Sequence, residues 1–407
     1  MKKSLMVLAG LWGLFAVAAA RGQGTWSTAS LSQARDHLVA TSVGNYALFG
    51  GGTDRVDIFN GSTGQWSTAA LSEARSYLAA TSVGDYALFG GGQRADATES
   101  KTVDMFNVTT GQWSTASLSM GRYSLAATSV RNYALFAGGR IWSGALDAYK
   151  DRVDIFNGST GVWSTASLSQ PASVQATSVG NYALFGGFYN VIGGWSKRVD
   201  IFNAGTGLWS IASLSLARTG LGAASVCDYA LFAGGAIPGD TYYNNVDIFN
   251  SITGLWSTAA LSQARAAAGT AVGNYALFGG GSYTSGNNRS NRVDIFNGIT
   301  GQWSTAALSQ ARGGIAATSV GDYALFAGGY DGTNYVTTVD IFTIPEPATL
   351  SLLALGGAAL AARRRRRSVA CAPPCVHRGL TRPRRRALLF NPQSAIRTRA
   401  QQAGRLT

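Results

Sequence analysis

The chain has 407 residues and a formal net charge of +13, which by itself favours a negatively charged partner such as nucleic acid. The excess lies at the two ends, because Lys2, Lys3, Arg21 and thirteen arginines from Arg363 onward make up sixteen of the 33 basic residues. The remaining 17 basic residues face 20 acidic ones, so we expect no nucleic-acid partner for the middle of the chain. That middle part holds one cysteine, Cys227, which excludes an internal disulfide framework.

Residues 1–20 have the pattern of a secretory signal peptide. Two lysines near the start precede an apolar stretch from Leu5 to Val17, and three alanines at positions 18–20 supply the small residues of a cleavage site. We therefore expect the protein to leave the cytoplasm. An intracellular adaptor role would conflict with this segment.

Between Trp26 and Phe342 the sequence repeats one pattern seven times. Each copy contains a Trp-Ser pair, a Leu-Ser pair, usually Ala-Arg, a stretch of small residues, Tyr-Ala-Leu-Phe, small residues rich in glycine, and Val-Asp-Ile-Phe or a close variant. The repeated tryptophans are Trp26, Trp66, Trp113, Trp163, Trp209, Trp256 and Trp303. They are 40 to 50 residues apart, and such a period built from short β-type runs is typical of a radial array of small sheets.

Each copy predicts four short strands. In the copy from Arg75 to Ser119, the β-type runs are 78–83, 86–89, 103–106 and 112–118, and Gly84-Asp85 separates the first two. A similar Gly-Asn or Gly-Asp pair recurs in most copies and suits a tight hairpin turn that needs positive φ. We therefore expect a four-stranded antiparallel meander in which the first strand, made of small residues, lies innermost.

Several features of the repeat resemble Kelch repeats: the paired glycines, the aromatic residue at the end of the third strand, the Trp that follows, and the Arg that opens the next copy. The resemblance covers roughly residues 25–343 and implies blades of four strands around a central channel. We predict an all-β fold, a seven-bladed Kelch-type β-propeller over residues 24–343. The copies begin with a fourth-strand motif and end with a third-strand motif, so strand 25–32 should join the last blade and close the ring.

The connections between the second and third strands differ from copy to copy, whereas the flanking strands barely change. These connections are 53–55, 93–102, 140–152, 188–198, 236–245, 282–292 and 330–338. Their aromatic residues lie among Asn, Asp, Ser and Gly, a mixture that stacks on sugar rings or forms a protein interface. We expect a binding surface there, and the alternative is that some rings fold back over the blades. The candidates are Trp142, Tyr149, Phe188, Tyr189, Trp195, Tyr242, Tyr243, Tyr283, Tyr330 and Tyr335.

An arginine opens the first strand in six copies, and an aspartate occupies the third strand in all seven. The arginines are Arg35, Arg75, Arg122, Arg218, Arg265 and Arg312, and the fourth copy has Gln170-Pro171-Ala172 instead. The aspartates are Asp57, Asp104, Asp154, Asp200, Asp247, Asp294 and Asp340. Recurrence in nearly every copy favours structural ion pairs. The alternative is a ring of guanidinium groups that receives an anion such as a uronate.

Most enzyme classes fail for lack of residues. A copper centre of the galactose-oxidase type needs two histidines and a crosslinked Cys-Tyr, but the repeat region has only His37. A Ser-His-Asp site would have to use this one His. We interpret His37 as a loop residue, because Tyr77 holds the same place in the next copy. The glycine runs lack the Lys-Ser/Thr of a phosphate loop. Paired carboxylates for glycoside hydrolysis remain available on the variable connections. They are Asp96, Glu99, Asp147, Asp151, Asp240 and Asp331.

After the repeats come Pro345-Glu346-Pro347, an apolar run over 348–362 and Arg363 to Arg367. This order resembles the bacterial PEP-CTERM sorting signal, which we assign to residues 344–367. The resemblance implies insertion in the inner membrane with the arginines in the cytoplasm, followed by processing by an exosortase, a membrane cysteine protease-transpeptidase. The apolar run spans about 22 Å as a helix, which is short for a permanent anchor, and adjacent arginines resist translocation. We expect a transient anchor.

Residues 368–407 continue where such signals normally end. They lack an apolar period and are expected to form a disordered basic tail, either a cytoplasmic extension or translation beyond the usual stop. Cys371, Cys375 and His377 could in principle bind a metal, but we expect no metal site. Cys227, which replaces a hairpin glycine, is expected to be a tolerated turn substitution rather than a reactive thiol.

The sequence therefore predicts a secreted, monomeric, non-catalytic binding or matrix module without cofactors. The expected partners are an exosortase and, as ligand, extracellular polysaccharide or an envelope protein. The alternative is an extracellular carbohydrate-active enzyme that uses loop carboxylates. Near-identical copies would also suit a scaffold with little specific recognition.

Overall fold

The computed structural model describes residues 24–344, apart from residues 36, 143–146, 191–193, 238–240 and 284–287 and the side chains of Asp147 and Asn190. The expected signal peptide over 1–20, the motif Pro345-Glu346-Pro347 with the apolar run and arginines that follow, and the tail 368–407 lie outside the described residues. Asp240 lies outside them as well.

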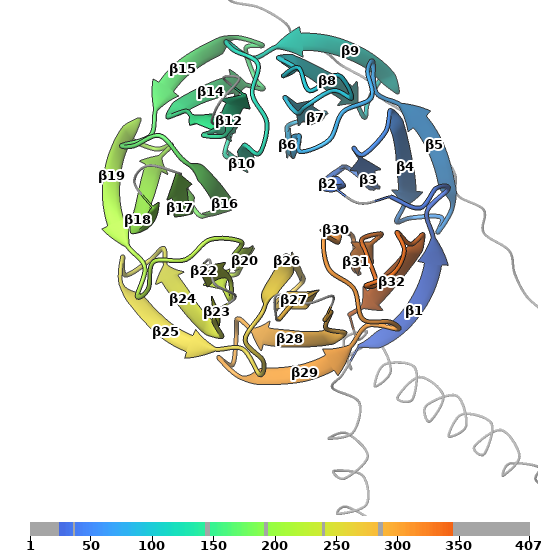
Figure 1. Cartoon of the computed structure of the whole chain (residues 1–407), viewed down its shortest axis with the longest axis vertical. Helices are drawn as coiled ribbons and strands as arrows, with labels where there is room; N and C mark the ends of the chain where they lie inside the picture. Colours follow the sequence, from blue (N-terminus) through green and yellow to red (C-terminus); the bar gives the residue numbers. More distant parts are fainter. Residues whose placement is uncertain are drawn as a thin grey trace, which may run out of the picture. The chain divides into compact units, whose positions relative to one another are not determined.

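The strands form seven four-stranded antiparallel sheets that stand like blades around a central axis (Figure 1). Blades 1 to 4 are β2 (Val39–Val43), β3 (Tyr46–Gly50), β4 (Arg55–Asn60), β5 (Trp66–Ala70); β6 (Ala79–Val83), β7 (Tyr86–Gly90), β8 (Thr102–Asn107), β9 (Gln112–Ser117); β10 (Ala126–Val130), β11 (Tyr133–Ala137), β14 (Arg152–Asn157), β15 (Trp163–Ser167); and β16 (Ser173–Val179), β17 (Tyr182–Asn190), β18 (Gly194–Asn203), β19 (Leu208–Ser213). Blades 5 to 7 are β20 (Gly222–Val226), β21 (Tyr229–Ala233), β24 (Asn245–Asn250), β25 (Trp256–Ala260); β26 (Ala266–Val272), β27 (Tyr275–Ser282), β28 (Arg292–Asn297), β29 (Trp303–Ala307); and β30 (Ala316–Val320), β31 (Tyr323–Ala327), β32 (Thr338–Thr343), β1 (Thr25–Ser30). The seven-bladed architecture expected from the repeats is confirmed.

The last blade combines the two ends of the repeat region. β1 pairs with β32 in antiparallel register, with Trp26 opposite Phe342 and Ser30 opposite Thr338. The expected strand 25–32 ends two residues early, at Ser30, because Ser32 donates its backbone N–H to the Asp57 carboxylate of blade 1 at 2.8 Å. The ring is therefore closed by pairing, and β32 has no open edge.

Tight hairpins join the first two strands of each blade. Gly44 and Gly84 adopt φ of 54° at this turn, in the left-handed region that favours glycine. Arg131 and Cys227 occupy the same place in blades 3 and 5 with φ of 51°. The turn geometry thus persists where the glycine is replaced.

The hydrophobic core is divided into clusters that lie between neighbouring blades. One cluster joins Leu48 and Ile58 of blade 1 to Phe89 and Phe106 of blade 2, and the same arrangement recurs around the ring. The repeated tryptophans pack against the third-strand phenylalanine of their own blade, with ring centroids 5.1 to 5.3 Å apart. The aromatic residues of the later strands therefore fill the space where the blades diverge.

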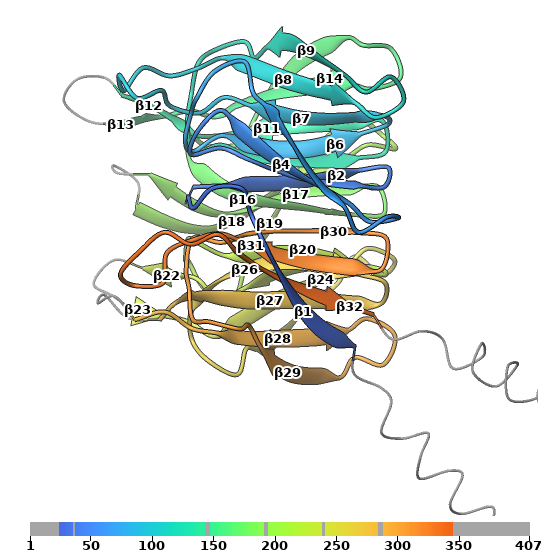
Figure 2. The same ribbon diagram turned by 90° about the vertical axis from the view of Figure 1, so that its right-hand side faces the viewer.

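The ring has two faces of different character. One face, here called the constant face, carries the hairpins between strands one and two and the turns between strands three and four. The opposite face, the variable face, carries the connections between strands two and three and the crossings to the next blade. Two extra hairpins, β12 (Arg140–Trp142) with β13 (Asp147–Tyr149) and β22 (Ala236–Ile237) with β23 (Thr241–Tyr242), project on the variable side, away from the start of β1 (Figure 2).

Candidate functional site on the variable face

The recurring arginines are buried rather than exposed at the variable face. Arg75, Arg122, Arg218, Arg265 and Arg312 are less than 2% exposed and Arg35 is 3% exposed. Each contacts the third-strand aspartate of the blade it enters: five of these pairs are 2.6 to 2.8 Å apart, and Arg75 contacts Asp104. Burial lowers the pKa of Arg122, and the neighbouring Asp154 partly offsets that shift. Side chains so enclosed cannot receive an anion at the channel mouth, so the uronate ring considered from the sequence is not formed.

The same aspartates hold the crossing from the previous blade. Ser72, which follows β5 of blade 1, donates its backbone N–H to Asp104 of blade 2 at 2.9 Å. In blade 4, where no arginine is available, Ser169 donates both its backbone N–H and its hydroxyl to Asp200 at 2.9 and 2.6 Å. The hydroxyl thus takes the place that a guanidinium holds elsewhere, and each aspartate links two consecutive blades.

A chain of aromatic contacts crosses the variable face from blade 1 to blade 3. His37 and Tyr77 hold equivalent places before β2 and β6, with ring centroids 4.1 Å apart. Tyr77 is 6.1 Å from the ring of Tyr123, and the guanidinium of Arg140 lies over Tyr123 at 4.8 Å. His37 and Tyr77 adopt φ of 53° and 57°, a conformation that costs energy for residues with a side chain.

The chain continues through the β12–β13 hairpin into blade 4. Arg140 pairs in register with Tyr149, whose ring lies edge-on to Tyr189 at 5.7 Å. Tyr189 in turn stacks on Trp195 at 5.5 Å with an interplanar angle of 23°. We call the set His37, Tyr77, Tyr123, Arg140, Tyr149, Tyr189 and Trp195 the aromatic row. It spans four blades, and Tyr77 is 38% exposed whereas Tyr123 is buried.

A second aromatic group lies between blades 6 and 7. Tyr330 and Tyr335 are 5.6 Å apart by ring centroids, and the Arg289 guanidinium lies 5.4 Å from the centre of the Tyr330 ring. With Ser282 and Gly314 they line a cavity of about 220 Å³. Tyr335 is 53% exposed, so this cavity is open to a ligand from the variable side.

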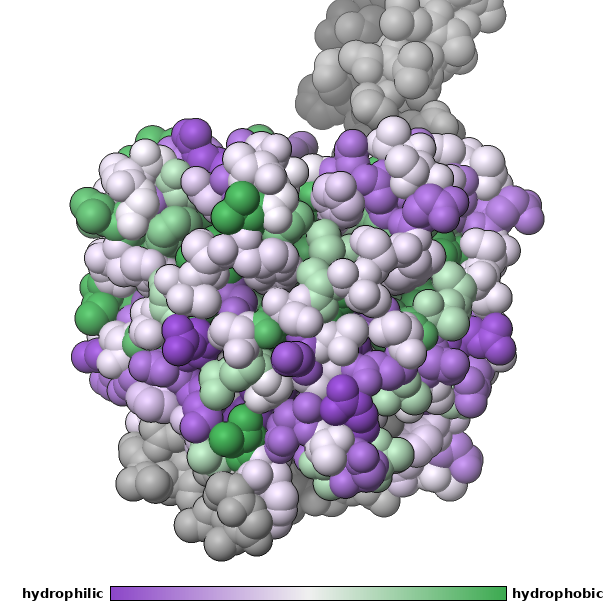
Figure 3. Space-filling view, turned by 90° about the horizontal axis from the view of Figure 1, so that it is seen from above, coloured by the Kyte–Doolittle hydropathy of each residue, from purple (hydrophilic) through white to green (hydrophobic). Residues whose placement is uncertain are grey.

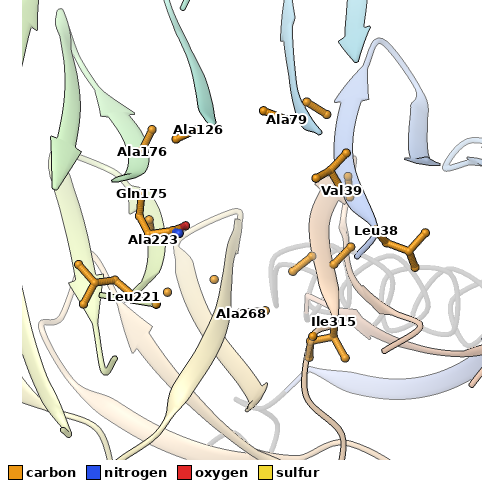
Figure 4. Close-up of a pocket in the computed structure, with 18 of the residues that line it drawn as sticks. Leu38, Val39, Ala79, Ala126, Gln175, Ala176, Leu221, Ala223, Ala268 and Ile315 are labelled. Carbon is orange, nitrogen blue, oxygen red and sulfur yellow. The ribbon is translucent and has the colours of Figure 1, made fainter. Parts of the chain in front are cut away.

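The central channel is lined by the first strands of all seven blades (Figure 4). It encloses about 410 Å³, and alanine, glycine and other aliphatic residues form its wall apart from Gln175. Gly314 lines both this channel and the cavity of Tyr330 and Tyr335, so the two spaces adjoin. The channel therefore offers polar backbone groups among small aliphatic side chains to a ligand.

The remaining predicted aromatic residues are dispersed. Trp142 is 52% exposed and its backbone N–H donates to Glu99 at 2.5 Å, which holds the β12–β13 hairpin against blade 2. Tyr242, Tyr243 and Tyr283 are half-buried.

The prediction that Phe188 is a surface aromatic available for binding is wrong, because its side chain is fully buried. β17 and β18 stay paired through this region, with Phe188 opposite Ser196, and the pairing carries the Phe188 ring into the core cluster of blades 3 and 4.

Among the described carboxylates of the variable connections, those of Asp96, Glu99 and Asp331 are used in local structure. Asp96 accepts hydrogen bonds from the hydroxyl and backbone N–H of Thr98, and these lower its pKa. Asp331 accepts from the backbone N–H groups of Asn334 and Thr333, which lower its pKa likewise. A general acid for glycoside hydrolysis needs the opposite shift. Within the described residues, no three His, Cys, Asp or Glu side chains come together as a metal site.

Cys227 belongs to the constant face and is exposed. Partial burial of its thiol, together with the nearby Asp228, raises the pKa of Cys227. Because the thiolate is the nucleophilic form, this environment disfavours reactivity at neutral pH.

Sequence reasoning misses the residues that connect the predicted aromatics. It gives no binding role to Tyr77, Tyr123, Arg140 or Arg289. His37 lies in a loop ahead of β2, as predicted, and its ring packs on Tyr77. A usable signal exists: the two positions after the repeated arginine are small in blades 5 to 7 but hold a ring in blades 1 to 3. On the side of the ring that Figure 3 shows, the apolar residues of the outer rim lie mostly singly among polar and intermediate ones.

Comparison with known proteins finds a sorting motif near the end of the chain. Residues 343–367 match the family model of the PEP-CTERM protein-sorting motif. The motif implies export, sorting to the cell surface and processing by an exosortase. No curated protein matches the chain. Among residues 24–344, the structure describes no helix of the length and hydropathy needed to cross a membrane.

Proposed function

We propose that this exported protein is a non-catalytic binding or matrix module whose variable face holds extracellular polysaccharide. The observation that carries the proposal is the aromatic row, which runs across four blades on the face where the copies differ. Aromatic rings offer large apolar surfaces of fixed orientation, which suit the faces of sugar rings. An extended row suits a chain of sugars better than a single small molecule. An envelope protein is the other ligand class that such rings fit.

The row also contains groups that bind hydroxyls. The phenol groups of Tyr77 and Tyr189 both donate and accept hydrogen bonds, and the guanidinium of Arg140 donates several. The cavity of Arg289, Tyr330 and Tyr335 supplies a second site with a cation beside two rings. A polysaccharide with acidic groups is compatible with both the rings and the neighbouring guanidinium groups.

A catalytic role is the weaker proposal. The described loop carboxylates Asp96 and Asp331 have lowered pKa values and serve in turns. Glu99 accepts the backbone N–H of Trp142. These roles favour binding over hydrolysis, which requires one carboxylic acid that keeps its proton near neutral pH.

Delivery would follow from the two ends of the chain. The Lys-rich start and apolar stretch of residues 1–20 support a signal peptide. The match over 343–367 supports processing by an exosortase while the run 348–362 is held transiently in the inner membrane. The repeat pattern supports a Kelch-type origin for the blades.

Affinity electrophoresis in gels that contain dextran, xylan, alginate or hyaluronan tests the proposal. Retardation by at least one polysaccharide is expected. Tyr77→Ser copies the residue that blade 3 carries at this place, Ser124, and together with Tyr189→Ala it should weaken that retardation about tenfold or more. Tyr242→Ala, outside the row, is the matched control and should leave it unchanged.

Two results would contradict the proposal. One is retardation that the Tyr77 and Tyr189 substitutions leave unaltered while the protein still unfolds at its normal temperature. The other is release of new reducing ends from any of the four polysaccharides, abolished by Asp147→Asn, which would establish the enzyme instead.

A further inference from the structure

The constant face carries a set of protruding apolar side chains. They occupy the turns between strands three and four in blades 3 to 6 or, for Leu208, the first residue of the fourth strand. They are Val162, Leu208, Ile252, Leu255 and Ile299, with exposed fractions of 61%, 68%, 75%, 69% and 69%. We call these five the apolar turns. Single exposed apolar residues need no explanation, but five at two recurring turn positions on four consecutive blades lie along one side of the constant face.

The equivalent turns elsewhere are polar, so the repeat does not require these side chains. Gln65 and Gln112 stand in blades 1 and 2 where Leu208 and Leu255 stand in blades 4 and 5. None of the six turns, 61–65, 108–112, 158–162, 204–208, 251–255 and 298–302, contains a charged residue. Uncharged turns with apolar tips suit the interface of a lipid bilayer. The charged residues of the hairpins on this face are Asp85, Arg131, Asp228 and Asp322, and two of them, Arg131 and Asp228, belong to blades 3 to 6.

The chain leaves the ring on this same face. In blades 3 to 6 the residue after the third strand donates its backbone N–H to the hairpin of its own blade, for example Ser251 to the Asp228 carbonyl at 2.8 Å. Ile344 makes the same bond to the Asp322 carbonyl at 3.0 Å in blade 7. The last described residue is therefore level with the turns of the constant face.

Chain length then limits how far this face can be from the apolar run. Four peptide steps separate Ile344 from Ala348, and they reach at most about 14 Å when fully extended. If residues 348–362 enter a membrane, the constant face cannot stand farther from it than this. Because Ile344 is level with the constant face, that face is the one nearest to the point where the run would enter.

We infer that the constant face docks on the lipid bilayer through the apolar turns while the apolar run is inserted. This inference rests on the proposed transient anchoring. Docking directs the variable face, with its aromatic row, away from the membrane toward extracellular polysaccharide. The occupant is thus the bilayer surface rather than a second copy of the chain.

Fluorescence of the full chain in vesicles of phosphatidylethanolamine and phosphatidylglycerol tests the docking. Cys227, Cys371 and Cys375 are first replaced by Ser, and a single cysteine then carries the environment-sensitive fluorophore NBD. Leu208→Cys reports the constant face, Trp142→Cys reports the variable face, and Leu355→Cys reports insertion of the apolar run. Lipids brominated on the acyl chain should quench NBD at 208 and 355 but not at 142.

The decisive comparison removes three of the four other apolar turns, those of blades 5 and 6. Ile252→Asn, Leu255→Asn and Ile299→Asn together change only exposed side chains, so the fold is preserved. They should abolish quenching at 208 and leave quenching at 355 intact. If NBD at position 208 is still quenched in this variant, the docking is overturned but the anchoring is not. The same holds if the protein without the three Asn substitutions shows quenching at 355 but none at 208. Absence of quenching at both 208 and 355 overturns both. NBD at position 208 could instead become shielded from water without being quenched, while the protein forms dimers. That result would assign the surface to a second copy of the chain and would also overturn the inference.

Discussion

The ring of Tyr323 in the last blade lies edge-on to the ring of Phe59 in the first, with centroids 5.6 Å apart. The same contact joins Tyr46 to Phe106 between blades 1 and 2 at 6.3 Å. The boundary at which the ring closes is therefore packed like an internal one. A cluster that includes Phe49 and Leu325 fills it.

Closure by β1 makes Trp26 equivalent to the other repeated tryptophans. Trp26→Ala removes the ring that packs on Phe342 at 5.2 Å and on Phe326 at 6.3 Å, and should lower the free energy of unfolding by about 3–5 kcal/mol. Trp66→Ala is the matched control, because Trp66 has the same contacts in blade 1. Urea unfolding should give similar losses for the two variants. A much smaller loss for Trp26→Ala would mean that β1 does not hold the ring together.

The third-strand aspartates should contribute differently to stability, depending on whether their partner is an arginine or a serine. Asp247→Asn leaves the buried guanidinium of Arg218 without its counter-charge, so a loss of about 3–5 kcal/mol is expected. Asp200→Asn in blade 4 leaves only the Ser169 groups less well satisfied, and should cost about 1 kcal/mol. Thermal unfolding of both variants makes the comparison. Equal losses would show that the ion pair adds nothing to the serine contacts.

The fold can be predicted because its determinants are local and repeated. The turn at Gly84-Asp85, the alternation along each strand and the placement of Trp26 ahead of the first complete copy are visible in the sequence and define the blades and their closure. The strand bounds differ by one or two residues where a neighbouring blade competes, as at Ser32, which bonds to Asp57.

The site is less predictable because its residues meet across blades. His37 and Tyr77 are 40 residues apart and become neighbours only when consecutive copies pack side by side. Composition likewise places Phe188 with the surface aromatics, although the continued pairing of β17 and β18 directs it into the core. The direction of a side chain in a connection depends on whether the connection continues the strand. Whether it does depends on the neighbouring strand with which it can pair.

The free energy of unfolding should decrease at acidic pH in part because Glu73 becomes protonated. Partial burial of Glu73 opposes its ionisation, but hydrogen bonds from Ser100 and Arg94 outweigh this effect and hold its pKa below the ordinary value of 4.5. A carboxylate with a lowered pKa stabilises the folded state above its unfolded-state pKa, and this contribution is lost as the pH falls through the folded-state pKa. Because Glu73 is partly exposed, the effect should be under about 1 kcal/mol and should weaken with salt.

Urea unfolding from pH 7 down to pH 3 measures this effect. Glu73→Gln, which introduces the residue present at this place in blades 1, 4, 6 and 7, should reduce the loss of stability on acidification. Glu99→Gln is the control, since the Glu99 carboxylate accepts only the Trp142 N–H in its described contacts. An identical pH dependence of wild type and Glu73→Gln would contradict the role assigned to this carboxylate.

Replacing Cys227 by glycine should stabilise the protein. Cys227 holds a φ of 51° that glycine adopts in other blades without strain, and its thiol makes only a 4.0 Å contact with Asn274. Relief of the left-handed conformation outweighs the added freedom of glycine in the unfolded chain, so a gain of about 0.5–1 kcal/mol is expected. The reverse change is the control: Gly84 has φ of 54° and open space where an added Cβ would lie, so Gly84→Ala should lose about 1 kcal/mol through the backbone alone. Calorimetric unfolding in the presence of a reductant compares the two. If Cys227→Gly lowers the unfolding temperature, the thiol contributes packing that outweighs the strain at this turn.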